Sequence, residues 1–207
     1  AKRSLQVLLI AGNHDSGQRL SFLESLLARQ GVHIAGVLAP GGRLEHVTLE
    51  DEYGPVTFWL MPYLFPALAA HALEDESIRD YDAAVRRVLE AQDVDFTRRN
   101  VLVAHQNVTH AGAEAPRGGS ESTVGGLGQV DDSAFAGFTY VALGHIHAAY
   151  ALGRESVRYA GSPLCYHFNE TRQRAKGPVL VELGPKGAPA SMETLTIPPL
   201  HPMREQI

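Results

Sequence analysis

Three polar clusters in this chain share one setting. Each directly follows a short apolar run that is typical of a buried strand: "GNHD" follows "QVLLIA", "HQN" follows "NVLVA", and "GHIH" follows "FTYVAL". The polar residues concerned are Asn13, His14, Asp15, His105, His145 and His147. Because the carboxyl ends of strands in an α/β sheet meet at one crevice, we expect these side chains to converge although they are far apart in sequence. Gly12 and Gly144 allow sharp turns that bring the backbone close to a ligand there.

Four of these residues are of types that bind transition metals. Asn13 offers an amide oxygen, and His105, His145 and His147 offer imidazole nitrogens. This mixture suits Mn, Fe, Zn or Ni better than Ca. If the backbone stays extended from His145 to His147, both imidazoles point the same way and a metal could use both.

The elements that must position these residues alternate between strands and helices. Strands are predicted from β-prone apolar runs at 6–11, 32–38, 44–50, 56–63, 100–105, 138–143, 148–153, 157–162 and 177–184. The last three runs are typical of an antiparallel series, and helical spacing of apolar residues predicts a helix over 77–91. The fold class expected is mixed α/β, with layered mixed β-sheets flanked by helices.

Two further segments carry specific expectations. Residues 16–31 are predicted to form a helix with its leucines on one face, more often a core face than one that pairs two subunits. Residues 106–132 are rich in Gly, Ser and Glu without a period. An unstructured loop of that length inside a domain usually serves a site, so we expect a functional loop there.

Length and composition describe one globular domain of 207 residues, of which 44% are hydrophobic. No stretch approaches the roughly 18 uninterrupted apolar residues of a membrane span, and a single cysteine fits a reducing compartment, so we expect a cytoplasmic protein with no membrane partner. The net charge of −5 leaves no global basic footprint, and any DNA contact would be local. No G-x-S-x-G elbow or P-loop occurs, which argues against a serine hydrolase or a P-loop nucleotidase.

The motifs and their order resemble those of the calcineurin-like metallophosphoesterases. The signature of that family includes G-N-H-D/E, an isolated metal-binding histidine after a strand, and G-H-x-H, and all three occur here in family order. The stretch "ALGHIHAAYALGRESVRYAGSPLCYHFNE" is most similar to the SbcD-type DNA repair exonucleases, in which G-H-I-H is followed by a hairpin, Y-x-GSP and an F-x-E ending. The resemblance extends from Gln6 to "PPLHPM" near the end of the chain.

The resemblance implies a two-metal site that hydrolyses a phosphodiester, usually described with Mn²⁺, with Mg²⁺ or another divalent ion as alternatives. Asn13, His105 and His145 would bind one ion, and His147 would help bind the other. Two ions suit this reaction because they neutralise the phosphate and lower the pKa of a water between them.

The resemblance also implies a catalytic role for His14, which would protonate the leaving oxygen or stabilise the transition state. Asp15 could orient the His14 ring as a hydrogen-bond acceptor. The partners implied are DNA, an SbcC-like ATPase subunit and a second copy of the chain in a homodimer.

The chain departs from the family in one respect. The motifs D-x-H and G-D-x-x-D, which precede G-N-H-D in the family, do not occur here, so a bridging carboxylate and ligands of the second ion are missing. We expect the chain to bind at most one ion well and to hydrolyse poorly or not at all. It is interpreted as a single, partial nuclease domain over 1–207 without the family's C-terminal capping domain, an internal segment of a longer nuclease. A naturally shortened, inactive relative is the alternative.

Three functions stay open. The first is the nuclease subunit of an SbcCD-like complex for double-strand-break repair, favoured by the "GSP" and "FNE" context. The second is a metallophosphoesterase for small phosphodiesters or phosphoproteins, favoured by the acidic net charge. The third is a catalytically inactive scaffold that has lost its ligands.

Overall fold

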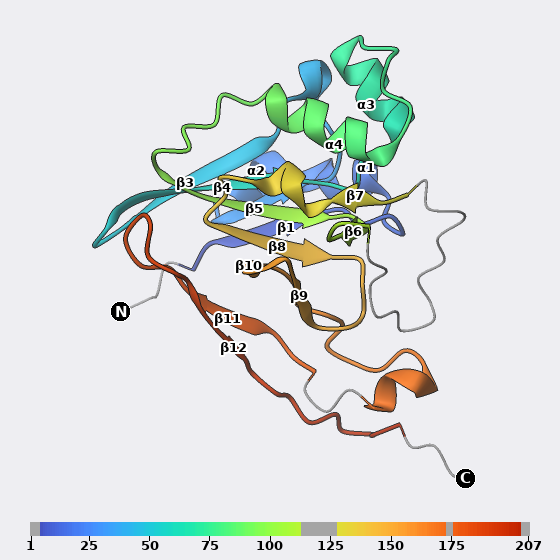
Figure 1. Cartoon of the computed structure of the whole chain (residues 1–207), viewed down its shortest axis with the longest axis vertical. Helices are drawn as coiled ribbons and strands as arrows, with labels where there is room; N and C mark the ends of the chain where they lie inside the picture. The colour runs from blue at the N-terminus through green and yellow to red at the C-terminus, as the bar shows by residue number, and fades with distance from the viewer. Residues whose placement is uncertain (1–4, 113–127, 173–175, 204–207) are drawn as a thin grey trace.

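A six-stranded mixed sheet forms the centre of the molecule (Figure 1). The computed structural model describes residues 5–112, 128–172 and 176–203. The strands of the main sheet, in spatial order, are β3 (Glu45–Asp51), β4 (Gly54–Met61), β5 (Arg99–His105), β8 (Tyr140–Gly144), β10 (Arg154–Tyr159) and β9 (Tyr150–Leu152). The four inner strands are parallel and both edge strands are antiparallel, so the inner strands all end at the same edge of the sheet.

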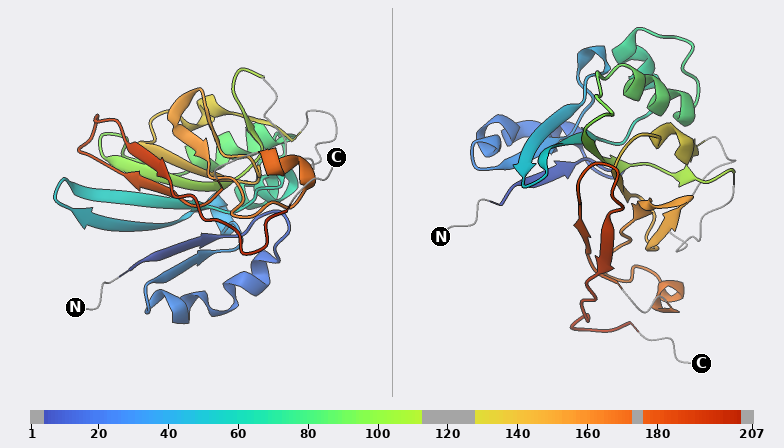
Figure 2. Two further views of the ribbon diagram at one scale, coloured as in Figure 1. Left: turned by 90° about the horizontal axis from the view of Figure 1, so that it is seen from below. Right: turned by 60° about the vertical axis from the view of Figure 1, so that its left-hand side comes forward.

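A second, two-stranded parallel sheet brings the first polar cluster to this edge. It consists of β1 (Val7–Ile10) and β2 (Val32–Ala35). Just beyond β1, the Ala11 amide donates to the Ala35 carbonyl at 3.1 Å, and the Tyr63 amide donates to the Ala11 carbonyl at 2.9 Å. The second bond ties the end of β1 to the segment that follows β4, and Figure 2 shows the β1–β2 pair beside the main sheet.

The predicted helix over 16–31 is broken into three short pieces. They are α1 (Gly17–Leu20), a 3₁₀ turn at Ser21–Leu23, and α2 (Glu24–Ala28), and none of their residues is buried. Phe22 is 82% exposed and Leu26 is 59% exposed, so the expectation of a core face is wrong. At the break the Gly36 amide donates to the Ser21 hydroxyl at 3.2 Å. Gly17, at the start of α1, lies so close to Gly36 that a Cβ on either glycine would overlap the carbonyl oxygen of the other.

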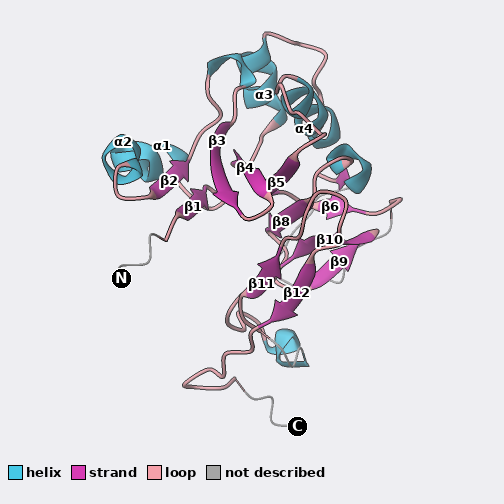
Figure 3. Cartoon of the chain, turned by 90° about the vertical axis from the view of Figure 1, so that its left-hand side faces the viewer, coloured by secondary structure: helices cyan, strands magenta, loops and turns pink. Residues whose placement is uncertain are grey.

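Helices α3 (Pro66–Leu73) and α4 (Tyr81–Glu90) cover one face of the main sheet (Figure 3). The carboxylate of Asp80 caps α4 by accepting from the Ala83 amide at 2.8 Å. The buried face of α4 (Ala84, Val85 and Val88) packs with inward side chains of the strands in the main core. The helix predicted over 77–91 is thus confirmed, four residues shorter at its start.

The opposite face is covered by a hairpin of β11 (Val179–Glu182) and β12 (Ser191–Thr194). Side chains at and just beyond these strands pack against a small cluster of Val56, Val101 and Tyr140. The strand predicted over 177–184 therefore does not extend the antiparallel series. Of that series only β9 and β10 pair with each other, and β10 pairs with β8 in parallel.

The segment 106–132 is structured at both ends. Strand β6 (Val108–Thr109) pairs in parallel with β7 (Val130–Asp131), and a 3₁₀ turn follows at Asp132–Phe135. The expectation of an unstructured loop is therefore wrong for these ends, and residues 113–127 lie outside the described residues. The buried Tyr159 hydroxyl accepts from the Val108 amide at 2.6 Å and donates to the Gln106 carbonyl at 2.7 Å, which fixes the chain just after β5.

The expected fold class is confirmed in its coarse form. The chain is a mixed α/β structure with several sheets and few helices, compatible with a metallophosphoesterase core. Within the described residues, no helix has both the length and the apolar character needed to cross a membrane.

Replacing Tyr159 by Phe tests the anchor behind β5. The change leaves the Val108 amide and the Gln106 carbonyl without their partner in a buried place, so we expect a loss of about 1–3 kcal/mol in the free energy of unfolding, measured with urea. Tyr53→Phe is the control, because this ring is 50% exposed, and it should change stability by less than about 0.5 kcal/mol. Equal stability of both variants would contradict the anchor.

Candidate metal centre

The imidazole of His105 lies at the end of β5, between Gly12, which follows β1, and Gly144, the last residue of β8. A Cβ added to Gly12 would be 2.8 Å from His105 Cε1, and one added to Gly144 would be 2.9 Å from His105 Nδ1. Neither glycine has a positive φ, so they are needed here for space and not for an unusual backbone conformation. The glycines of two polar clusters thus make room for the histidine of the third.

His105 contacts one predicted ligand from each of the other two clusters. Its Nε2 lies 2.9 Å from Asn13 Oδ1, and since an amide oxygen only accepts, Nε2 carries the proton in this hydrogen bond. The His145 ring lies 5.3 Å from the His105 ring, centroid to centroid, at 71°. The structure therefore brings together Asn13, His105 and His145, the three residues predicted to bind one ion.

Electrostatic interactions connect His105 with the remaining predicted residues. Burial lowers the pKa of His105 to about 4; His145, His14 and His147 also lower it, and Asp15 opposes them. The ring is therefore neutral at pH 7. A neutral imidazole is the form that binds a metal. Because Nε2 carries the proton toward Asn13, an ion at Nε2 would require that proton to move to Nδ1.

His145 and His147 have different surroundings. Strand β8 ends at Gly144, and His145 has a φ of 104°, so the extended backbone that would point both rings the same way is not present. The His145 ring lies near His105 and also 6.2 Å from the Tyr63 ring. The His147 ring lies 5.1 Å from the Tyr166 ring. The extended backbone that would let one ion use both His145 and His147 is therefore not present.

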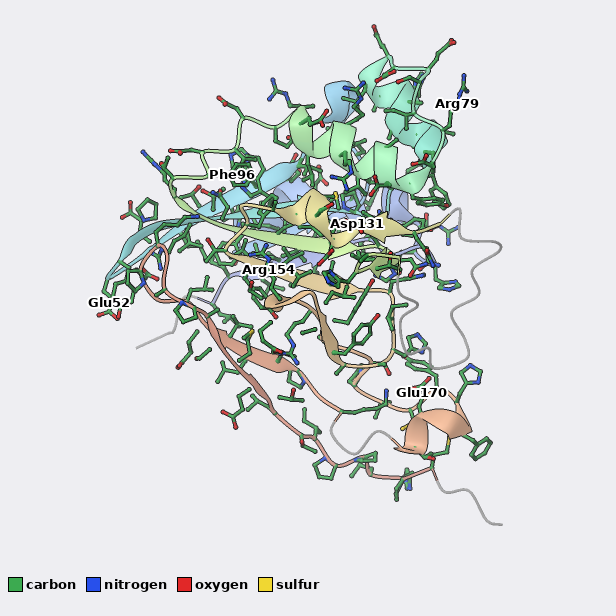
Figure 4. All side chains as sticks on the ribbon, in the orientation of Figure 1. Glu52, Arg79, Phe96, Asp131, Arg154 and Glu170 are labelled. Carbon is green, nitrogen blue, oxygen red and sulfur yellow. The ribbon has the colours of Figure 1, made fainter. Side chains whose placement is uncertain are left out.

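Glu170 is a buried partner of His147 that the sequence did not predict. It lies in the 3₁₀ turn Phe168–Arg172 (Figure 4), and its Oε1 is 3.2 Å from His147 Nδ1. Burial by itself would raise the pKa of Glu170, but hydrogen bonds from Lys176, His147 and the Tyr166 amide outweigh burial and keep the pKa below its usual value. The "FNE" element contained this residue, but the sequence did not indicate its contact with His147.

Tyr63 is a second neighbour that the sequence did not single out. Its ring lies 6.1 Å from the His105 ring. Burial and a hydrogen bond with Tyr81 raise the pKa of Tyr63, so its hydroxyl stays protonated at neutral pH. Its only signal in the sequence is its place two residues after β4, the same setting as the polar clusters.

His14 and Asp15 lie in a tight turn after β1, and both are exposed. The Asp15 carboxylate accepts from the Gly12 amide at 2.8 Å, and the Asp15 amide donates to the Gly12 carbonyl at 3.2 Å. Asp15 thus stabilises the turn that carries Asn13 and His14. A cleft of about 960 Å³ opens beside this turn, lined among others by Asn13, Asp15 and residues of α3.

The donor atoms fit part of a metal coordination shell. The amide oxygen of Asn13 and the imidazoles of His105 and His145 are suitable ligands for a divalent transition metal. Over residues 5–112, 128–172 and 176–203, however, no group of three or more His, Cys, Asp or Glu side chains could hold an ion. The three neutral donors bring no carboxylate to offset the ionic charge.

The pKa of His105 predicts how stability depends on pH. Because the pKa is lower in the folded chain (about 4) than in the unfolded chain (about 6.5), the unfolded state takes up the proton first as the pH falls. Stability should therefore fall between about pH 6.5 and pH 4, by on the order of 3 kcal/mol from this residue. Urea unfolding across this range should show a weaker dependence in His105→Gln, and identical profiles would contradict the assignment.

Alanine at Gly12 or Gly144 should displace the His105 ring. An added methyl group in such a packed place typically costs about 1–3 kcal/mol of unfolding free energy. Gly128→Ala is the matched control, because a Cβ there meets nothing within 4 Å and its φ is not positive. NMR signals of the His105 ring should move in the first two variants and stay in the control; unchanged signals in all three would show that the glycines are not needed.

Comparison with known proteins gives a distant relative over nearly the whole chain. The chain is 27% identical over 203 residues to a protein from Staphylococcus epidermidis that is named as the SbcD component of the nuclease SbcCD. The match covers 97% of this chain and 51% of that protein, so the chain spans about half the length of this relative. No protein-family model matches the chain. The chain is therefore similar, at low identity, to an SbcD nuclease component.

Proposed function

We propose that this chain carries the catalytic face of a metal-dependent phosphodiesterase that acts on DNA, a nuclease of SbcD type with a calcineurin-like metallophosphoesterase core. The observation that carries the proposal is the convergence of Asn13, His105 and His145 from three separate strand ends. The distant similarity to a protein named as part of a nuclease supports the same activity.

Asn13, His105 and His145 are the proposed ligands of one divalent ion, with Mn²⁺ as the first candidate, and His147 is a proposed ligand of a second ion. Such ions would neutralise the phosphate and make a bound water more acidic. Burial keeps His105 neutral, and its two glycine neighbours orient the ring; an ion at Nε2 would require the proton of that nitrogen to move to Nδ1. Asn13 now shares a hydrogen bond with Nε2, and both atoms would turn to the ion.

His14 is the proposed proton donor to the leaving oxygen. It is exposed on the turn that Asp15 closes, so it can reach a substrate bound over the strand ends. An imidazole changes its charge near neutral pH, which suits it to give a proton to an alkoxide as the phosphodiester breaks. Asp15 affects His14 indirectly, by stabilising the turn that carries it.

The proposed partners follow from the name of the relative. A component of an SbcCD nuclease implies an SbcC-like ATPase and DNA as the substrate. A homodimer is also proposed, and the exposed Phe22, Leu23 and Leu26 offer an apolar surface for it. Cytoplasmic localisation is also proposed, because the relative is named as part of a nuclease.

A phosphodiesterase for small esters is the second candidate. The net charge of −5 and the absence of a global basic footprint in the sequence favour it, because DNA binding depends mainly on lysine and arginine contacts to phosphates. An inactive scaffold is the third outcome that the experiments must be able to reveal.

Variants of the histidines separate metal binding from turnover. Mn²⁺ affinity, measured by calorimetry, should fall in His145→Ala and His147→Ala and stay unchanged in His14→Ala. In a longer chain that also carries the D-x-H and G-D-x-x-D motifs before Gln6, turnover should fall by about 10²- to 10⁴-fold in His14→Ala, the usual contribution of general acid catalysis. The control is His33→Ala, since His33 bonds to Gln6 on the β1–β2 pair. Equal Mn²⁺ affinity and equal turnover in all variants would disprove the site.

The substrate decides between the candidates. With Mn²⁺, cleavage of duplex DNA ends supports the nuclease, whereas cleavage of a chromogenic phosphodiester alone supports the second candidate. No Mn²⁺-dependent cleavage of either substrate, even in a longer chain that carries D-x-H and G-D-x-x-D before Gln6, supports the scaffold.

A further inference from the structure

We propose that Glu170 and Lys176 form a buried ion pair that positions His147 and fixes which of its ring nitrogens carries the proton. The inference rests on the proposed function, in which His147 binds a metal ion. It assigns a positioning role to two residues that lie 23 and 29 positions after that histidine.

Glu170 is fully buried and is surrounded by donors. Its Oε1 lies 3.2 Å from His147 Nδ1, and its Oε2 lies 3.0 Å from Lys176 Nζ. Oε2 also accepts from the Tyr166 amide at 3.2 Å. The Ser162 hydroxyl lies 3.4 Å from Oε2, but it donates to the Leu164 carbonyl at 2.7 Å. The carboxylate thus has donors on both oxygens and is held in one orientation.

Lys176 holds the same histidine from its backbone side. Its ammonium group donates to the His147 carbonyl at 3.0 Å and to Ser162 Oγ at 2.7 Å. The Ser162 amide donates to the same His147 carbonyl at 3.0 Å. His147 is therefore fixed through both its ring and its main chain, by residues from separate segments.

The carboxylate determines the tautomer of the ring. An ionised carboxylate only accepts hydrogen bonds, so the proton of a neutral His147 ring must be on Nδ1, the nitrogen that faces Glu170. The lone pair is then on Nε2. Carboxylate partners of this kind orient metal-binding histidines and make them more basic, and their loss typically lowers metal affinity by about 10- to 100-fold.

A purely structural role explains this pair less well. Burying two charges carries a desolvation penalty that their attraction often fails to exceed, and apolar residues of similar size frequently give equal or greater stability. In this chain the side chains of the pair are 0% and 9% exposed, and they surround a histidine that is partly exposed. The most specific effect of the Glu170–Lys176 pair is to hold the His147 ring in one orientation.

The test compares two double variants of the full chain that both lack the lysine charge. Glu170→Leu with Lys176→Met removes the acceptor without leaving a lone buried charge, and Glu170→Gln with Lys176→Met keeps an oxygen acceptor. The readout is the ¹⁵N NMR spectrum of the His147 ring without metal, which distinguishes the two tautomers. The Nδ1–H form should be kept in the wild type and the Gln variant and lost in the Leu variant.

A second pair provides the control for specificity. His110 Nδ1 lies 3.0 Å from both carboxylate oxygens of Asp132, so Asp132→Leu should change the signals of His110 and leave those of His147 unchanged. In the Leu double variant Mn²⁺ affinity should also fall by about 10- to 100-fold relative to the Gln double variant.

The inference is overturned if the Leu double variant keeps the Nδ1–H form, or if the Gln double variant loses it. Because the tautomer is read without metal or substrate, this result does not depend on whether the chain cleaves DNA. Absence of Mn²⁺ binding in the wild type, with the tautomer pattern as expected, would count against the proposed function and leave the positioning role in place.

Discussion

The centre of this molecule depends on the space between two glycines. The His105 ring lies so close to Gly12 and Gly144 that a single methyl group on either would overlap it. The ring therefore fixes the separation of the loops after β1, β5 and β8. Burial in this gap also lowers its pKa to about 4, so the same packing that joins three strand ends keeps the imidazole in the neutral form that binds metals.

The candidate centre around this ring has two parts, and the residues that surround each part are different. Asn13 and His145 contact His105 directly, and Tyr63 lies beside them. His147 lies in a second environment, with Glu170 and Tyr166 as neighbours. The division begins at His145, whose positive φ ends β8 and separates its ring from that of His147. The structure therefore gives His145 and His147 separate surroundings.

The sequence predicted the convergence of the polar clusters because parallel strands end at a common edge of the sheet. That rule needs only the order of the strands along the chain and the direction in which they run. It also predicted most strands and α4. It could not predict contacts that depend on the tertiary path, such as Glu170 on His147 or Tyr63 beside His105. The leucines of 16–31 led to a wrong prediction because helical spacing shows which residues share a face but not whether that face is covered. The strand over 177–184 was wrongly expected to continue the antiparallel series: as β11 it pairs with β12, which the sequence did not predict, and the hairpin packs on the sheet instead of joining it.

The central claim is that the neutral His105, held by these glycines, is a ligand of a metal ion. Electron spin echo spectroscopy of the chain with bound Mn²⁺ tests it most directly, because it detects nitrogen nuclei coordinated to the ion. The account predicts histidine nitrogen couplings in the wild type that weaken in His105→Ala and persist in His33→Ala. Couplings that are absent from the wild type, or unchanged in His105→Ala, would contradict it.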